Sequence, residues 1–353
     1  MLYREVSTGK KISQIGLGTS QFGSEAWGYG AFYAEHEAHR IVRRAVELGI
    51  TLFDTAEIYG DGQSERILGE ALGEDRASVF VATKFRPILP PSFLLRQRAA
   101  ASARRLGVTH LDLYQLHWPN MLAGDSSVMR QMRQLQLDGL VAEVGVSNYA
   151  LPRWRAAEKL LGARILSNQV PYNLITRPAE ADLAFAREHN RLIIAHSPLA
   201  QGLLSGKYDK DNRPRNPGRA NSSYFTAEAL ERFDALLTLL REVAHSHAAS
   251  VAQIALAWVI RDPAVVAIPG ASSVAQLENN VAATEIALTD DEYQALDAAG
   301  RNVPPAGEPG GRRSSQILHQ ARAATESVRH SWHVARAVRG GAAAEVSISA
   351  TRD

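Results

Sequence analysis

The chain is organised around one stretch, Phe53-Asp54-Thr55-Ala56-Glu57-Ile58-Tyr59-Gly60. It follows an apolar run at residues 50–53, which has the length and composition of a short buried strand. Asp54 and Tyr59 are therefore expected just past the carboxyl end of a strand, on the turn into the next helix. In a parallel α/β barrel, catalytic residues collect at that end of the strands.

Two later apolar runs end in the same way. Residues 79–82 lead into Lys84, and residues 111–116 lead into His117. An ammonium at the end of a buried strand needs a carboxylate partner, and Asp54, one strand earlier, is the natural one. Taken singly, Asp54 could be a helix cap, Tyr59 a turn aromatic and His117 a satisfied core histidine. Their joint occurrence at three successive strand ends favours a catalytic site.

The rest of the chain alternates between helical and strand patterns, which is typical of βα units. We expect a hairpin at 3–15 and eight strands, at 15–19, 50–53, 79–82, 111–116, 141–146, 165–168, 192–195 and 265–268. We expect helices at 38–48, 64–72, 92–106, 128–137, 152–161, 179–189, 227–245, 251–260, 274–280 and 290–299, with Ser64 as a candidate cap and a long loop at 201–225. The pattern predicts an α/β fold, a (β/α)8 TIM barrel over residues 1–300 with an N-terminal β-hairpin.

Two further stretches bear on domain organisation. The spacing of Gly16, Gly18 and Gly23 misses the dinucleotide fingerprint, and no helix follows at once, so a Rossmann domain is disfavoured. Residues 301–353 are expected to form a C-terminal extension, a Pro- and Gly-rich linker followed by a helical or disordered tail. A loosely docked tail is favoured over a lid on the barrel mouth or an oligomer contact. Its three histidines have no acidic or cysteine neighbours, so no metal site is expected there.

Composition narrows the class of protein. With 45% hydrophobic and 22% charged residues, the 353-residue chain is typical of a soluble protein that buries a sizeable core. A net charge of +2 gives no strong field for nucleic acid or an anionic membrane. The absence of cysteine excludes disulfides, thiolate metal sites and a cysteine nucleophile. No apolar run has the length of a signal peptide or a bilayer span, so we expect a cytoplasmic protein, with its oligomeric state left open.

The four polar groups fit carbonyl reduction. Hydride addition develops an alkoxide that needs a proton donor, and an ordinary tyrosine pKa of about 10 is too high for efficient exchange near neutrality. We expect the Lys84 ammonium to lower the pKa of Tyr59, Asp54 to keep Lys84 charged, and His117 to hydrogen-bond the carbonyl oxygen. A metal-dependent barrel isomerase or hydrolase is disfavoured, because only His117 and Asp54 qualify as ligands, beside a lysine that would repel a cation.

These residues and several other blocks resemble the aldo-keto reductase superfamily over residues 1–300. The blocks occur in order, each at an expected strand end: Phe53-Asp54-Thr55-Ala56, Tyr59-Gly60, Thr83-Lys84, Leu116-His117-Trp118-Pro119, Gly145-Val146-Ser147-Asn148, Asn168-Gln169, Ser197-Pro198-Leu199, Gly202-Leu203-Leu204 and Pro269-Gly270-Ala271-Ser272-Ser273. The resemblance implies a (β/α)8 barrel that transfers hydride between NADP(H) and carbonyls or alcohols. It implies a catalytic tetrad of Asp54, Tyr59, Lys84 and His117, with the phenol as proton donor.

The resemblance also implies the cofactor contacts. Ser147, Asn148 and Gln169 match the residues that hold the nicotinamide carboxamide, a group that needs both donors and acceptors. The remaining expected contacts lie around the nicotinamide ring, the pyrophosphate and the adenosine phosphate: Gly18, Thr19, His196, Ser197, Leu199, Gln201, Gly202, Lys207, Arg219, Gly270, Ser272, Gln276, Asn279 and Asn280.

Two positions depart from the family pattern. His196 stands where an aromatic ring usually stacks on the nicotinamide, and near its usual pKa an imidazole would make cofactor affinity weaker or pH-dependent. The corner after the last strand is neutral where some members place Lys or Arg against the 2′-phosphate. Lys207 and Arg219 are the expected compensation. NADP(H) is therefore the expected cofactor, with NAD(H) left open.

An aromatic wall is expected above the tetrad. Trp27, Phe85 and Trp118 are the main candidates, and the candidate additions are Tyr29, Tyr224 and Phe225. Such a wall favours an apolar or sugar-ring substrate over a carboxylic acid. The sequence thus predicts an NADP(H)-dependent oxidoreductase of small aldehydes or ketones, or of the corresponding alcohols or sugars. The alternative is a regulatory or sensor protein that binds the nicotinamide nucleotide with little turnover.

Overall fold

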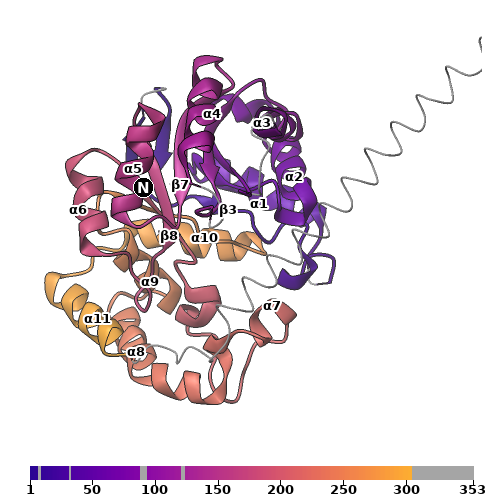
Figure 1. The fold of residues 1–353 in the computed structure, drawn as a ribbon. Coiled ribbons are helices and arrows are strands. Elements are labelled where there is room, and N and C mark those ends of the chain that lie inside the picture. Colours follow the sequence, from indigo (N-terminus) through magenta and orange to yellow (C-terminus); the bar gives the residue numbers. More distant parts are fainter. Residues whose placement is uncertain (7–8, 32, 88–93, 121–123, 304–353) are drawn as a thin grey trace, which may run out of the picture. The chain divides into compact units, whose positions relative to one another are not determined.

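Eight parallel strands form one sheet, and helices lie around it (Figure 1). They are β3 (Leu17–Gly18), β4 (Leu52–Asp54), β5 (Phe80–Phe85), β6 (Leu111–Leu116), β7 (Val141–Ser147), β8 (Ser167–Pro171), β9 (Leu192–His196) and β10 (Val265–Ala267). Each strand pairs with the next one along the chain. Parallel bridges from Ile15 to Ala267 and from Gly18 to Gly270 bring the last strand beside the first. The sheet is therefore closed, which confirms the predicted (β/α)8 barrel.

The computed structural model describes residues 1–6, 9–31, 33–87, 94–120 and 124–303. The tail predicted over residues 301–353, with its linker and histidines, lies outside the described residues from position 304 onward. Within the described ranges, no helix is both long enough and apolar enough to cross a membrane.

Helices follow the strands as the sequence pattern predicts. They are α1 (Glu35–Glu47), α2 (Gln63–Leu72), α3 (Leu94–Arg105), α4 (Ser126–Leu137), α5 (Leu151–Leu161), α6 (Glu180–Glu188), α7 (Pro217–Ala220), α8 (Ala227–Ser246), α9 (Val251–Val259), α10 (Val274–Ala282) and α11 (Asp290–Asn302). Helix α1 buries Ala38, Ile41, Val42 and Ala45, the stripe expected of a helix packed on a sheet. Capping boxes start α9 and α11.

The predicted N-terminal hairpin is confirmed. Strands β1 (Tyr3–Glu5) and β2 (Lys11–Ser13) pair antiparallel. Val6 and Ile12 join one buried cluster with side chains of the barrel interior, among them Leu52, Phe80 and Leu113. Apolar burial therefore seals the N-terminal end of the barrel, and the chemistry is left to the other end.

The prediction that Ser64 caps α2 is wrong. The residue preceding α2 is Gly62, and Ser64 lies inside the helix, fully buried. Its hydroxyl donates to the Thr19 carbonyl at 2.8 Å and lies 3.0 Å from the Thr55 hydroxyl. Ser64 therefore ties α2 to the ends of β3 and β4, and supports the segment that carries Asp54.

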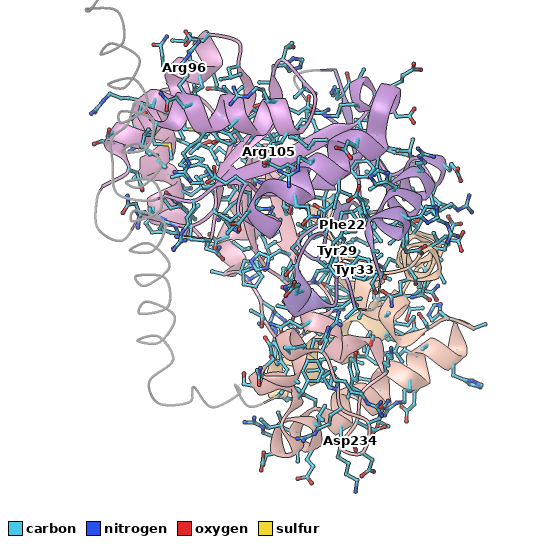
Figure 2. The ribbon with its side chains drawn as sticks, turned by 90° about the vertical axis from the view of Figure 1, so that its right-hand side faces the viewer. Phe22, Tyr29, Tyr33, Arg96, Arg105 and Asp234 are labelled. Atoms are coloured by element: carbon cyan, nitrogen blue, oxygen red, sulfur yellow. The ribbon has the colours of Figure 1, made fainter. Side chains whose placement is uncertain are left out.

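The long loop between β3 and α1 packs on its own aromatic residues. Figure 2 labels Phe22, Tyr29 and Tyr33, three aromatic residues of this loop. The Tyr29 and Tyr33 rings lie edge to face with centroids 5.5 Å apart, and the Tyr33 hydroxyl donates to the Gln21 carbonyl at 2.5 Å. The predicted loop at 201–225 contains two short 3₁₀ segments, η4 (Ala200–Ser205) and η5 (Ser223–Phe225), besides α7.

Candidate active site

Asp54 and Lys84 form a buried ion pair at the carboxyl ends of β4 and β5. The Lys84 Nζ donates to Asp54 Oδ1 at 2.6 Å and to the Thr55 carbonyl at 2.8 Å. The Lys84 side chain is 0% exposed and the Asp54 side chain is 3% exposed. A buried ammonium is tolerated only when such partners satisfy its hydrogen bonds, so this pair holds the Lys84 nitrogen in one place.

Tyr59 completes the hydrogen bonding of the ammonium. The Lys84 Nζ donates to the Tyr59 hydroxyl at 3.3 Å and lies 4.9 Å from the centroid of its ring. Gly60 follows with a φ of 55°, and a Cβ there would come within 2.8 Å of the Gly23 carbonyl oxygen. A glycine is therefore required at the turn that presents the phenol.

The ionisation of Tyr59 differs from the sequence-based expectation. Burial works against the charge on Lys84, but Asp54 and Tyr59 outweigh it and raise the pKa of Lys84. Burial raises the pKa of Tyr59, and the nearby ammonium lowers it by less. The predicted net lowering of the Tyr59 pKa is therefore wrong for this structure, because desolvation of the phenolate outweighs the attraction of one cation. Near neutral pH the phenol keeps its proton.

His117 lies beside the phenol. Its ring centroid is 5.6 Å from that of Tyr59, at an interplanar angle of 82°, and its backbone N–H donates to the Phe85 carbonyl at 3.0 Å. Burial, reinforced by the charge of Lys84, lowers the pKa of His117 to about 2. The imidazole is therefore neutral across the physiological range, and its buried Nδ1 has no hydrogen-bond partner within the described residues.

A cluster of neutral polar groups adjoins these four side chains. The Gln169 Nε2 donates to Asp54 Oδ2 at 2.7 Å, and the Ser147 hydroxyl donates to the Gln169 carbonyl at 2.8 Å. The Asn148 Nδ2 donates to Ser147 Oγ at 3.0 Å and to the His117 carbonyl at 3.4 Å. The predicted trio Ser147, Asn148 and Gln169 therefore meets at the carboxyl ends of β7 and β8, next to the ion pair.

His196 ends β9, and its ring Nδ1 lies 3.3 Å from the Ser197 hydroxyl. Burial and the charge of Lys84 lower the pKa of His196 to about 4. The expectation of a charge titrating near the usual histidine pKa is therefore wrong, because burial disfavours the charged imidazole and the nearby ammonium disfavours it further. The imidazole is neutral at neutral pH.

The loop after β9 brings several of the predicted cofactor residues together. The Gly202 N–H donates to the Leu199 carbonyl at 2.9 Å, and the Arg219 Nε donates to the Gln201 carbonyl at 2.7 Å. The Arg219 guanidinium also lies 5.6 Å from the centroid of a Trp27 ring. Lys207 is exposed, with its Nζ 5.9 Å from the Tyr208 ring centroid. Arg219 thus belongs to this cluster, whereas Lys207 points to the surface.

The corner after β10 is held by hydrogen bonds within the chain. The Ser272 N–H and hydroxyl both donate to Gln276 Oε1 at 3.0 Å. The Asn280 Nδ2 donates to the Gly270 carbonyl at 3.4 Å, and Asn279 Oδ1 accepts from Ser250 at 2.9 Å. Ser272 and Gln276 thus lie at the start of α10, whereas Asn279 and Asn280 lie near its end, where they contact Ser250 and the Gly270 carbonyl.

Two residues at the end of β3 stand beside the ion pair. The Gly18 N–H donates to the Pro269 carbonyl at 3.1 Å, which ties β3 to β10. The Thr19 hydroxyl donates to the Asp54 carbonyl at 2.9 Å. Both therefore close the barrel around Asp54, and the Thr19 hydroxyl is already committed to that contact.

The predicted substrate wall needs one correction. Trp118 is half-buried, with its ring centroid 4.5 Å from that of His117, and Trp27 is half-buried beside Arg219. Phe85, in contrast, is 2% exposed and packs on Tyr114 with centroids 5.0 Å apart. Successive side chains of a strand point to opposite faces, so Phe85 points away from Lys84 and is a core residue.

Tyr29, Tyr224 and Phe225, the further candidates for the substrate wall, contact other residues. Tyr29 packs on Tyr33, and the Tyr224 hydroxyl lies 3.4 Å from the Thr176 hydroxyl. Phe225 is 2% exposed and packs on Tyr208. Phe225 therefore belongs to the core, and the described geometry brings none of the three into contact with the tetrad.

Arg86 lies at the same end of the barrel as Lys84. It follows β5 directly, is half-buried, and its Cζ lies 5.8 Å from the Trp118 ring centroid. The alternation of side chains along a strand puts Arg86 on the same side as Lys84 and one step further along.

Metal-ligating groups lie elsewhere. Within the described ranges, one group of such residues brings its ligand atoms within 4.8 Å of one another: Glu35, His39 and Glu70. They lie on α1 and α2, and the two acids are exposed. This surface group contributes nothing to the site around Lys84.

Comparison with known proteins decides the family. The model of the aldo/keto reductase family matches residues 14–301. The chain belongs to this family. An uncharacterized oxidoreductase of Mycobacterium tuberculosis is 52% identical over 86% of this chain and 94% of its own. The methylglyoxal reductase of Escherichia coli is 34% identical over 78% of this chain and 90% of its own.

Solved structures agree with the family assignment. An aldo-keto reductase from Klebsiella pneumoniae, solved in complex with NADPH, is 28% identical and has a TM-score of 0.65. The match covers 86% of this chain and 96% of that one. The chain is thus an aldo-keto reductase-type oxidoreductase with the barrel fold of its relatives.

Proposed function

We propose that this protein is an NADP(H)-dependent oxidoreductase that reduces small aldehydes or ketones, or oxidises the corresponding alcohols, with Tyr59 as the general acid and base. The observation that carries the proposal is the Lys84 ammonium, which donates to both Asp54 and the Tyr59 hydroxyl at one end of the barrel. Side chains from separate strand ends meet there, as carbonyl reduction requires.

The donor set beside the tetrad fits a nicotinamide. Ser147, Asn148 and Gln169 present a hydroxyl and two amides, which match the mixed donors and acceptors of a carboxamide. In the neighbouring loop, the buried Gln201 Oε1 has no hydrogen-bond partner within the described residues. Buried polar atoms are normally hydrogen-bonded, so this oxygen can accept a hydrogen bond from a bound molecule. A reduced nicotinamide bound at this place would supply the hydride. The relative from Klebsiella pneumoniae was solved with NADPH, which supports NADP(H) as the cofactor.

The chain's own residues supply the proton and the orientation. The raised pKa of Tyr59 keeps its proton on the phenol until a carbonyl oxygen gains charge, and the proton then passes from the Tyr59 hydroxyl to that oxygen. Lys84 stabilises the phenolate that remains. His117, neutral and next to the phenol, hydrogen-bonds the oxygen and fixes its direction. In alcohol oxidation the phenolate takes the proton back.

The test compares wild type with Tyr59→Phe on a panel of small aldehydes and ketones, with NADPH and with NADH. Loss of the hydroxyl removes the proton donor but leaves the Ser147, Asn148 and Gln169 cluster, so we expect turnover to fall by about a thousandfold or more while cofactor still binds. Nicotinamide absorbance measures the rate, and quenching of tryptophan fluorescence measures cofactor binding.

Tyr3→Phe is the matched control. Its hydroxyl donates to the Gly49 carbonyl on the hairpin side of the barrel, and the residue is 45% exposed. The control is expected to keep the wild-type rate. Equal rates in wild type and Tyr59→Phe would show that the Tyr59 hydroxyl is not the proton donor. A wild type that binds cofactor and reduces nothing on the panel would point to the binding or sensor protein instead.

A further inference from the structure

Gln115 is a fully buried polar residue on β6, in the row of side chains that contains Lys84. The strand register pairs Lys84 with Gln115 and Gln115 with Gly145, and Gly145 in turn with Ser167. Paired residues of neighbouring strands point to the same face of a sheet, and Lys84 points into the barrel toward the Asp54 carboxylate. Gln115 therefore lies inside the barrel at the level of Lys84.

The neighbouring strands leave room for this amide and orient it. A Cβ at Gly145 would come within 2.8 Å of the Gln115 Cγ and 2.6 Å of the Ser167 Oγ, so only glycine fits there without displacing one of them. The Ser167 hydroxyl donates to Gln115 Oε1 at 3.3 Å. The Gln115 Nε2 therefore lies on the side of the amide away from Ser167. It is buried and has no hydrogen-bond partner within the described residues.

Packing alone does not explain a glutamine at this depth. Leu113, two residues earlier on the same face of β6, belongs to the apolar cluster inside the barrel. A leucine at position 115 would extend that cluster, whereas a buried N–H without a partner destabilises the folded state. The polar groups next to Gln115 offer the better explanation.

The polar group that Gln115 supports is the Asp54 carboxylate. Burial raises the pKa of Asp54, and Lys84 opposes this effect most strongly. Gln169 and Gln115 oppose it as well. Asp54 accepts from Lys84 Nζ on Oδ1 and from Gln169 Nε2 on Oδ2. Because two carboxylate oxygens offer about four acceptor positions, Asp54 can take a further donor.

We propose that Gln115 is a positioning residue whose Nε2 supports the Asp54 carboxylate from inside the barrel. A carboxylate held in this way keeps Lys84 charged and directed at the Tyr59 hydroxyl. The inference rests on the proposed function and deepens it, because it adds a residue that acts on proton transfer through Asp54. The sequence pattern does not single out Gln115, since it lies within the run 111–116 that is interpreted as an apolar strand.

The experiment replaces Gln115 with leucine, which removes the donor and suits the apolar interior. We expect kcat to fall by about tenfold, the effect of one hydrogen bond to a charged group. The KM of a small aldehyde and the affinity for NADPH should stay at the wild-type level, because Gln115 acts through Asp54. Urea unfolding should need at least as much denaturant as wild type, because an apolar group replaces an unpartnered polar one.

The pH profile separates positioning from packing. Without the donor, Asp54 takes up a proton at a higher pH, so the acidic fall in kcat should begin at a higher pH than in wild type. Gln115→Glu keeps the shape of the side chain but places a second carboxyl beside Asp54, so kcat should fall further. Both variants leave in place the other titratable side chains around the ion pair: Lys84 on β5, Tyr59 after β4, His117 after β6 and His196 on β9.

Tyr114→Phe is the matched control, because it also removes a buried and unpartnered polar group from β6. The Tyr114 ring packs on Phe85, on the other side of the strand, so kcat and its pH profile should match wild type. If leucine impairs folding, Gln115→Met carries the same expectations with an unbranched side chain.

The inference is overturned if kcat of the leucine variant stays at the wild-type level, or if kcat falls without a shift of its acidic limb. In either case the proposed function stands. A wild type that reduces no carbonyl on the panel overturns both.

Discussion

At each end of the barrel a buried aspartate accepts a hydrogen bond from a lysine, and the two sites differ in what else surrounds the carboxylate. At the N-terminal end, Asp112 accepts from Lys10 Nζ and Arg76 Nη1, both at 2.8 Å, and from the Val81 N–H at 2.9 Å. At the C-terminal end, Asp54 accepts from Lys84 at 2.6 Å and from the Gln169 amide at 2.7 Å.

The two sites differ in whether the ion pair contacts a side chain that can transfer a proton. Around Asp112, two cations and a backbone donor meet one anion, and among the described residues none of its hydrogen-bond donors is a neutral titratable side chain. Around Asp54, the single ammonium has a further contact to the Tyr59 hydroxyl, a group that can lose and regain a proton. A buried ion pair alone is therefore weak support for a catalytic role, whereas a buried pair coupled to a proton-transferring group supports one strongly.

The largest effect expected from this comparison is on turnover in Lys84→Met. Without the ammonium, nothing stabilises the phenolate left after proton transfer, and Asp54 loses its cationic partner. We expect turnover to fall by about a thousandfold or more in protein that still folds. Circular dichroism verifies the fold, and nicotinamide absorbance follows the rate.

Lys10→Met is the matched control at the other end of the barrel. It removes the lysine of the Asp112 site, where Arg76 and the Val81 N–H remain. Its turnover should match wild type. A comparable loss of turnover in both variants would show that the two lysines act only through the stability of the barrel.

A smaller effect is expected on stability in Asp112→Asn. Loss of this carboxylate leaves Arg76, 8% exposed, without its anion, whereas Lys10, 20% exposed, can reach water. We expect unfolding to become easier by about 3 kcal/mol, at the lower end of the range for a broken buried ion pair. Urea unfolding followed by tryptophan fluorescence measures the change, while turnover of the folded variant should stay near wild type. A loss below about 1 kcal/mol, the level of an exposed pair, would contradict a structural role for Asp112.

The smallest effect concerns pH. The pKa of His117 is lowered from 6.5 to about 2 in the folded protein. Above pH 6.5 the imidazole is neutral in both states, but as the pH falls below that value only the unfolded chain takes up the proton, so stability decreases. The urea midpoint should therefore fall between about pH 7 and pH 5, and fall less in His117→Gln. His36→Gln, at an exposed position on α1, serves as control.

The same lowered pKa bears on turnover. Because His117 stays neutral, kcat/KM should show no acidic limb from this residue between about pH 5 and pH 8. A titration in that range that disappears in His117→Gln would mean that the imidazole is charged in the working enzyme. Its role would then be that of a proton donor rather than an orienting group.

Much of the fold could be predicted from local pattern. The eight strands, the hairpin and the helices follow from short apolar runs and from the spacing of apolar residues, and the observed elements agree with them to within a few residues. The strand ends then identify Asp54, Lys84 and His117 as neighbours, because parallel strands present their carboxyl ends at one rim. The errors concern single side chains. Ser64 resembles a helix cap in sequence, but its hydroxyl is bound to β3 and β4.

Sequence alone determined the barrel, its family and the set of polar residues at its C-terminal rim, since these depend on periodicity and on the order of residues along the chain. The tertiary structure decided how deeply single side chains are buried, and so moved Phe85 from the expected substrate wall to the core. It also decided the net direction of the Tyr59 and His196 pKa values. Those properties depend on burial and on charges brought together from distant parts of the chain, and a linear sequence contains neither quantity explicitly.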